Sequence, residues 1–287
     1  MNSYKSILFV CCVFCIAFDG LRPAHATYLF SIDELSVTKN GVVTFMDDFN
    51  DGVPPPSAPD FSNGQPADYF VQGTLGPEAG GKLQLNSSGT IPSMNATGVP
   101  VLFQGAILHT NIQQGSNQGL RKDDSLMVTA VFDLISPAAR GQSYGVRFTD
   151  RAEELNLPGD DLAEIQVIHT LDDQLLVRFL KADFIDHTID FIDQAPLDTS
   201  KNQIALTLAK AAGLSTVMAS YAYFDGTTWE APQTFANPTD IFHSEDWTRV
   251  QLDAREIVVP EPATFPLFLS GLAALGILAR RRRDPAT

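Results

Sequence analysis

The sequence predicts an all-β protein: an antiparallel jelly-roll β-sandwich, flanked by an N-terminal signal peptide and a C-terminal single transmembrane helix. Three observations predict this architecture. Ten short segments show either period-two alternation of apolar and polar residues or a short apolar run, and most are separated by Gly, Pro, Asn or Asp. Between the two chain ends, no segment keeps a helical period over 12 residues. Ten strands without an internal repeat are typical of one sandwich, which we place at residues 27–259.

The predicted strands and turns follow from local residue patterns. LDDQ (Leu171 to Gln174) and FDGTTW (Phe224 to Trp229) are predicted hairpin turns, because Asp and Gly tolerate left-handed backbone conformations. Residues 205–214 have a helix-forming composition, but Leu206 and Leu208 alternate with polar or small residues, which favours a strand. The ten predicted strands lie within residues 42–49, 81–86, 101–110, 125–134, 143–150, 163–170, 174–184, 202–211, 215–224 and 249–259.

The N-terminus has the order of features of a secretory signal peptide. Lys5 precedes an apolar run at residues 7–18, and Ala24-His25-Ala26 supplies the small residues at Ala24 and Ala26 that signal peptidase reads. We therefore expect export through the Sec translocon and cleavage by signal peptidase after residue 26. The three cysteines all lie inside the apolar run, so the mature protein is expected to contain neither disulfides nor thiolate metal sites: Cys11, Cys12 and Cys15.

The C-terminus is predicted to be a membrane anchor with one orientation. Residues 263–279 carry no charge, a length at the lower limit for a membrane-spanning helix. Four arginines follow at once and are expected to stay cytoplasmic, which leaves the folded domain outside: Arg280, Arg281, Arg282 and Arg283. Pro260 and Pro262 prevent a strand or helix from running through this junction, so Pro260-Glu261-Pro262 should be extended and accessible at the membrane surface.

The tail at residues 260–287 resembles the PEP-CTERM sorting signal in its motif, apolar helix and basic cluster. The resemblance implies that an exosortase-type membrane protease cuts near Pro260-Glu261-Pro262. It also implies a Gram-negative host that makes exopolysaccharide. The protein would then be exported, transiently anchored in the inner membrane, and finally located at the cell surface or in the extracellular matrix. The alternative is a plain C-terminal anchor with an incidental PEP sequence.

The body of the chain resembles the concanavalin A-like lectin/glucanase superfamily, including its laminin-G-like members. FMDDFNDG at residues 45–52 is similar to the opening strand of such domains, and residues 203–229 are similar to their central pair of long strands. VQLDAREIVV at residues 250–259 is similar to their closing strand. The resemblance implies that this closing strand returns beside the opening one.

A calcium site is a hypothesis that depends on this implied pairing. Asp47, Asp48 and Asp51 crowd the end of the predicted opening strand, and Asp253 on the closing strand would approach the same place. Ca²⁺ takes 6–8 oxygen ligands, carboxylates among them. The alternative is a solvated acidic turn in which one Asp acts as a cap. Otherwise we expect no cofactor.

Composition and motifs predict a non-catalytic protein. The net charge of −15 repels nucleic acid. The chain lacks the Glu-x-Asp-x-x-Glu pattern of glycosidases of this fold, the histidine motifs of zinc enzymes and a Gly-x-Ser-x-Gly elbow. We therefore expect a cell-surface or exopolysaccharide-matrix protein. A diverged glycosidase or lyase is a weaker alternative.

A lectin that binds the cell's own polysaccharide is the main alternative function. Sugar sites stack aromatic rings on pyranose faces beside a few fixed polar groups, and four aromatic residues are candidates for this role: Tyr221, Tyr223, Trp229 and Trp247. The two tyrosines alternate along one predicted strand, a pattern that is also typical of core residues.

Overall fold

The computed structural model describes residues 29–50, 69–86, 90–94, 100–111, 123–135, 137, 140–149, 162–183, 188–241 and 249–257. These residues form sixteen strands and no helix. Every strand pair is antiparallel, which confirms the prediction of an all-β, antiparallel protein. The jelly-roll topology stays a prediction. The predicted signal peptide and terminal helix lie outside the described residues, in which no helix is long and apolar enough to cross a membrane.

One layer, sheet A, is centred on the two long strands β1 and β7. Strand β1 pairs with β7 on one side and with β2 and β4 on the other, and β12 and β13 continue the sheet beyond β7. The short strands β14 and β15 both pair with β13. The bounds are β1 (Leu29–Lys39), β2 (Val42–Asp47), β4 (Leu83–Asn86), β7 (Leu126–Asp133), β12 (Gln203–Lys210), β13 (Thr216–Phe224), β14 (Gln233–Thr234) and β15 (Thr239–Asp240).

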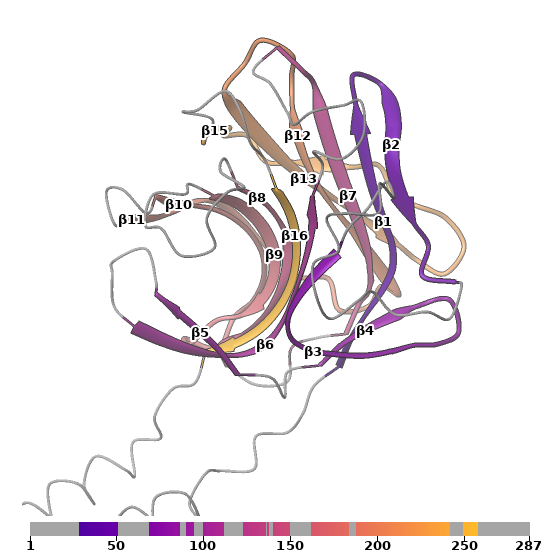
Figure 1. Cartoon of the computed structure of the whole chain (residues 1–287), viewed down its shortest axis with the longest axis vertical. Coiled ribbons are helices and arrows are strands. Elements are labelled where there is room, and N and C mark those ends of the chain that lie inside the picture. Colours follow the sequence, from indigo (N-terminus) through magenta and orange to yellow (C-terminus); the bar gives the residue numbers. More distant parts are fainter. Residues whose placement is uncertain are drawn as a thin grey trace, which may run out of the picture.

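The second layer, sheet B, curves strongly in Figure 1. Its strand order is β11-β10-β9-β8-β16-β6, with β3 and β5 both paired to β6; β3 also pairs with β4 and so joins the two sheets. The bounds are β3 (Tyr69–Glu78), β5 (Thr90–Met94), β6 (Pro100–Asn111), β8 (Gln142–Thr149), β9 (Leu162–His169), β10 (Leu175–Asp183), β11 (Thr188–Pro196) and β16 (Arg249–Ile257).

The hydrophobic core lies between these layers and follows from period-two alternation. In β12, buried Ile204, Leu206 and Leu208 alternate with half-buried neighbours. Each such side chain contributes about 1.5–3 kcal/mol when fully removed from water. Aromatic rings fill the centre, where the rings of Phe30 and Tyr144 lie 4.2 Å apart between centroids. Because side chains from both sheets form one buried cluster, the layers stabilise each other.

Both predicted hairpin turns are confirmed. Between β9 and β10, Asp173 has a φ of 72°, and the Thr170 N–H donates to the Gln174 carbonyl at 2.8 Å. After β13, Gly226 has a φ of 96°, in the left-handed region that glycine tolerates best. The predicted strand within residues 205–214 is also confirmed, because β12 runs to Lys210.

The implied neighbours of the closing strand are wrong. Strand β16 pairs with β6 and β8, whereas β2, which contains residues 45–47 of the predicted opening segment, pairs with β1. Strand β1 also precedes that segment in the chain, so residues 45–52 do not open the fold. The last strand therefore occupies the interior of sheet B rather than lying beside β2.

Candidate functional site

The rim of sheet A at the end of β13 carries an exposed tryptophan. Trp229 is 45% exposed and follows the turn after β13. It forms an antiparallel bridge with Phe224, and the two ring centroids lie 5.3 Å apart with planes tilted by 41°. The turn thus fixes the indole against a second aromatic ring while one side of it remains accessible to solvent.

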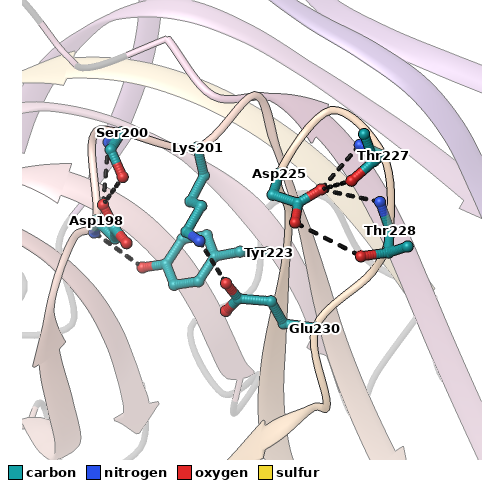
Figure 2. Close-up of polar contacts among 8 residues, drawn as sticks. All are labelled: Asp198, Ser200, Lys201, Tyr223, Asp225, Thr227, Thr228 and Glu230. Atoms are coloured by element: carbon teal, nitrogen blue, oxygen red, sulfur yellow. Dashed lines mark hydrogen bonds and ion pairs between the residues drawn. The ribbon is translucent and has the colours of Figure 1, made fainter.

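Fixed polar groups lie in the loop between β11 and β12 and in the turn after β13, as Figure 2 shows. The Asp198 N–H donates to the Tyr223 hydroxyl at 3.1 Å, and the Ser200 hydroxyl donates to Asp198 Oδ1 at 2.6 Å. Lys201 Nζ points to the carboxylate of Glu230 and forms an ion pair with it. This contact raises the pKa of Lys201.

Asp225 makes the turn before Trp229 rigid. Its Oδ1 accepts hydrogen bonds from the Thr227 hydroxyl at 2.6 Å and from the Thr227 and Thr228 N–H groups at 2.8 and 2.9 Å. These donors, the Thr227 hydroxyl first, lower the pKa of Asp225 to about 2. An exposed indole held against a second ring, after a turn fixed by hydrogen bonds, is a feature that can orient a polar ligand. We name this set, Asp198, Lys201, Asp225, Trp229 and Glu230, the Trp229 rim.

Two of the other residues that were predicted to contact a sugar, Tyr221 and Tyr223, are not exposed. Tyr221 and Tyr223 are 5% and 3% exposed and pack edge to face with centroids 5.5 Å apart. The Tyr221 hydroxyl donates to Gln233 Oε1 at 2.8 Å. Both rings belong to the core cluster, so they have no free face for a sugar. Trp247 lies outside the described residues.

The structure separates the residues of the calcium hypothesis. Asp47 ends β2, and its Oδ1 accepts a hydrogen bond from the Phe49 N–H at 2.8 Å, as a cap-like Asp in a turn does. Asp48 is exposed next to it, whereas Asp253 is buried within sheet B. Asp51 lies outside the described residues. In the described part of the chain, no three His, Asp or Glu side chains gather as a metal site.

Asp253 belongs instead to a buried ion-pair network that sequence reasoning missed. Arg255 contacts the carboxylates of both Glu164 and Asp253. Arg147 lies 4.0 Å from each of the same two carboxylates. The side chains come from β8, β9 and β16, and all are 17% exposed or less. Two guanidinium groups therefore balance two carboxylates inside sheet B; we call these four residues the buried ion-pair network.

Strand register explains how the network assembles. Glu164 lies directly opposite Arg147, and Gly145 lies between Asp253 and Gln166 on its two neighbouring strands. Burial raises the pKa of Glu164, and the charge of Arg255 opposes this rise. The raised pKa reflects a carboxylate that has left water and depends on its arginines.

This network stabilises strands and presents no open group to solvent. Both carboxylates are already paired with guanidinium groups, and their side chains are 2% exposed or less. The signal that could have revealed it is the presence of charged residues inside apolar strand segments, as in VRF (Arg147), AEI (Glu164) and LDAREI (Asp253 and Arg255). Charges rarely occupy such positions unless they are paired.

Comparison with known proteins identifies a family motif in the C-terminal part of the chain. No curated protein matches it. Among solved structures, a GH43_12 protein retrieved from the capybara gut metagenome aligns with 13% identity and a TM-score of 0.35, over 58% of this chain and 28% of the other. The concanavalin A-like resemblance stays a prediction at this level of similarity. Residues 258–283 match the PEP-CTERM protein-sorting motif, so the chain carries this sorting motif immediately after β16.

Proposed function

We propose that the protein is an exported, non-catalytic component of the cell surface or exopolysaccharide matrix, processed by an exosortase-type membrane protease. The observation that carries this proposal is the PEP-CTERM motif at residues 258–283, which begins one residue after β16 ends. The motif contains the predicted Pro260-Glu261-Pro262 sequence, the apolar segment 263–279 and the four arginines.

The position of the motif is compatible with release of an intact folded body. Strand β16 pairs with β6 and β8 over nearly its whole length and is held from both sides. A cut at Pro260-Glu261-Pro262 removes no residue of this strand. The protease can therefore separate the tail without unfolding sheet B.

Replacing Pro260, Glu261 and Pro262 together by alanine in the native host tests this proposal. The altered protein should remain at full size in the membrane fraction, whereas the original is shortened and released. Arg140→Ala is the matched control, since it changes an exposed side chain in the described body and should be processed as the original is. Equally efficient release of the triple variant contradicts the proposal.

A specific observation favours a second function, binding of a polysaccharide at the Trp229 rim. The exposed indole is held against the Phe224 ring, and stacking on a sugar ring requires such an exposed aromatic face. The net charge of −15 disfavours an acidic glycan. The proposed ligand is therefore a neutral polysaccharide of the matrix.

Affinity electrophoresis through gels that contain neutral host polysaccharide tests this second function. The original protein should be retarded, and Trp229→Ala should restore free mobility. Phe191→Ala is a suitable control, because Phe191 is also an exposed aromatic residue, 63% exposed, but lies on β11 of sheet B. Equal mobility of the original protein and Trp229→Ala excludes this site.

A further inference from the structure

Sheet A carries an uncharged surface on the side that faces away from the core. Cross-strand register places ten outward residues in two rows over β2, β1, β7, β12 and β13. The first row is Val43, Thr38, Met127, Ala209 and Met218; the second is Met46, Ser36, Thr129, Thr207 and Ser220. We call these ten residues the uncharged face.

Large apolar side chains are exposed on this face. Val43 and Met46 on β2 are 57% and 58% exposed, and Met127 and Met218 are 45% and 40% exposed. The remaining six residues are half-buried and small. In the middle of the face, the hydroxyls of Thr129 and Thr207 lie 3.0 Å apart and hydrogen-bond to each other. Exposed apolar side chains gathered on one face of a sheet in this way favour an interaction site.

The charge of the chain indicates which partner fits. With 34 acidic and 19 basic residues, two copies repel each other over most of their surfaces. The ten residues of the uncharged face contribute no charge to that repulsion. In the next outward row Glu34 lies opposite Val131, and beyond it Asp33 and Asp133 are paired with Lys82 at 3.0 and 2.6 Å. Contact through this face therefore brings two acidic proteins together over ten residues that carry no charge.

The row pattern of the face allows two copies to interdigitate. Neighbouring strands lie about 4.8 Å apart, so Met127 and Met218 stand roughly 10 Å apart with Ala209 in the gap between them. A two-fold rotation about an axis along the rows would place Met127 and Met218 of each copy over Thr129 and Ser220 of the other, and Val43 over Met46. Sheets pack face to face at about 10 Å, and methionine adapts to irregular gaps.

We propose that the uncharged face is a homodimer interface, and that its occupant is the same face of a second copy of this chain. A two-fold interface uses one patch twice, and the rows of this face allow that arrangement. Added salt should strengthen the dimer, because it screens the repulsion between two acidic bodies and leaves the apolar contact in place.

Sedimentation velocity of the protein recovered from its host, over a range of concentrations, tests the proposal. The original protein should form a dimer that tightens between low and moderate salt. Met127→Lys combined with Met218→Lys should raise the dimer dissociation constant at least tenfold, or about 1.4 kcal/mol. Phe191→Lys on β11 and Leu171→Lys in the β9–β10 turn are controls at apolar positions that are 63% and 54% exposed, and both should dimerise as the original does.

Thermal unfolding must show that the double variant is folded. If it is not, Thr207→Arg in the central row replaces it and should weaken the dimer in the same way. A monomeric original protein overturns the proposal, as does a dimer that neither variant weakens or that the controls weaken equally. A monomer that binds neutral polysaccharide through Met127 and Met218 would assign the face to a glycan and also overturn it.

Discussion

Arg255 on β16 contacts Glu164 on β9 across the intervening strand β8. In the strand register, Arg255 lies opposite Ser143 of β8, and Glu164 lies opposite Arg147 of β8. Gly145 lies midway between Ser143 and Arg147 on the same face of β8, so a side chain that reaches from Arg255 to Glu164 passes over Gly145. Because Gly145 has no side chain, the guanidinium of Arg255 can cross β8 and reach the carboxylate. A residue without a side chain therefore makes the buried ion-pair network possible.

Arg255→Ala should destabilise the fold by about 3–5 kcal/mol, because it leaves two buried carboxylates with only the more distant Arg147. Urea unfolding measures this loss. Arg140→Ala is the control, because its ion pair with Asp173 is 3.0 Å long but more than half exposed, and its removal should cost at most about 1 kcal/mol. Similar losses in both variants would contradict a special contribution from the network.

Gly145→Ala should destabilise the fold by about 1–3 kcal/mol or more, because the new methyl group has no room. A Cβ at this position would lie 2.4 Å from the Ile165 carbonyl oxygen and 2.9 Å from the Gln166 Cα. Gly41→Ala is a useful comparison, because its Cβ would meet nothing within 4 Å and its cost arises only from a φ of 77°. An unchanged urea midpoint for Gly145→Ala would show that β8 and β9 move apart easily.

The strands that the sequence pattern predicted show either period-two alternation, as β12 does, or a run of buried residues, as β9 does. Two of the missed strands have a physical reason. In β1 the register shifts between Ile32 and Glu34, which breaks the period of two, so buried Ile32 and Leu35 are three residues apart. Strand β11 lies at an edge of sheet B and is exposed on most positions, so its acidic residues resemble those of a loop.

The candidate sites were predictable only where local sequence determines exposure. Trp229 follows a recognisable turn, and its exposure could be anticipated from that position. Tyr221 and Tyr223 alternate like core residues and are core residues. The buried ion-pair network depends on strand order, since Glu164 and Arg255 are 91 positions apart in the chain. No local pattern contains such a pairing.

Tyr144→Phe should stabilise the protein by about 1 kcal/mol. Tyr144 is fully buried, and its hydroxyl has no hydrogen-bond partner among the described residues, so folding removes it from water without compensation. Tyr223→Phe is the matched control and should destabilise, because the Tyr223 hydroxyl accepts a hydrogen bond from the Asp198 N–H. Thermal unfolding midpoints should move in opposite directions; a lower midpoint for Tyr144→Phe would indicate a partner for this hydroxyl.

Truncation should distinguish the fold from the tail. A chain that ends at residue 257 keeps all of β16 and should unfold cooperatively on heating. A chain that ends at residue 248 lacks this strand, and β6 and β8 then lose their common neighbour within sheet B. This shorter chain should show no cooperative transition in circular dichroism. A cooperative transition in the shorter chain would mean that β6 and β8 can pair without β16.

Acid stability should depend on Asp225. Hydrogen bonds from the Thr227 hydroxyl and the Thr227 and Thr228 N–H groups lower its pKa from 3.8 to about 2. Between these two pKa values the unfolded chain binds more protons than the folded one, so the stabilisation is complete above pH 3.8 and is lost as the pH falls toward 2.

Asp225→Asn removes this titration, so its loss of stability relative to the original protein should be largest at neutral pH and smallest near pH 2. Thr227→Val keeps the carboxylate but removes the hydroxyl, so its effect should lie between the two. Urea unfolding at pH 6, 4, 3 and 2 measures the three proteins together. If the difference between the original protein and Asp225→Asn does not change with pH, the pKa of Asp225 is the same in the folded and unfolded chains, and this turn contributes nothing to acid sensitivity.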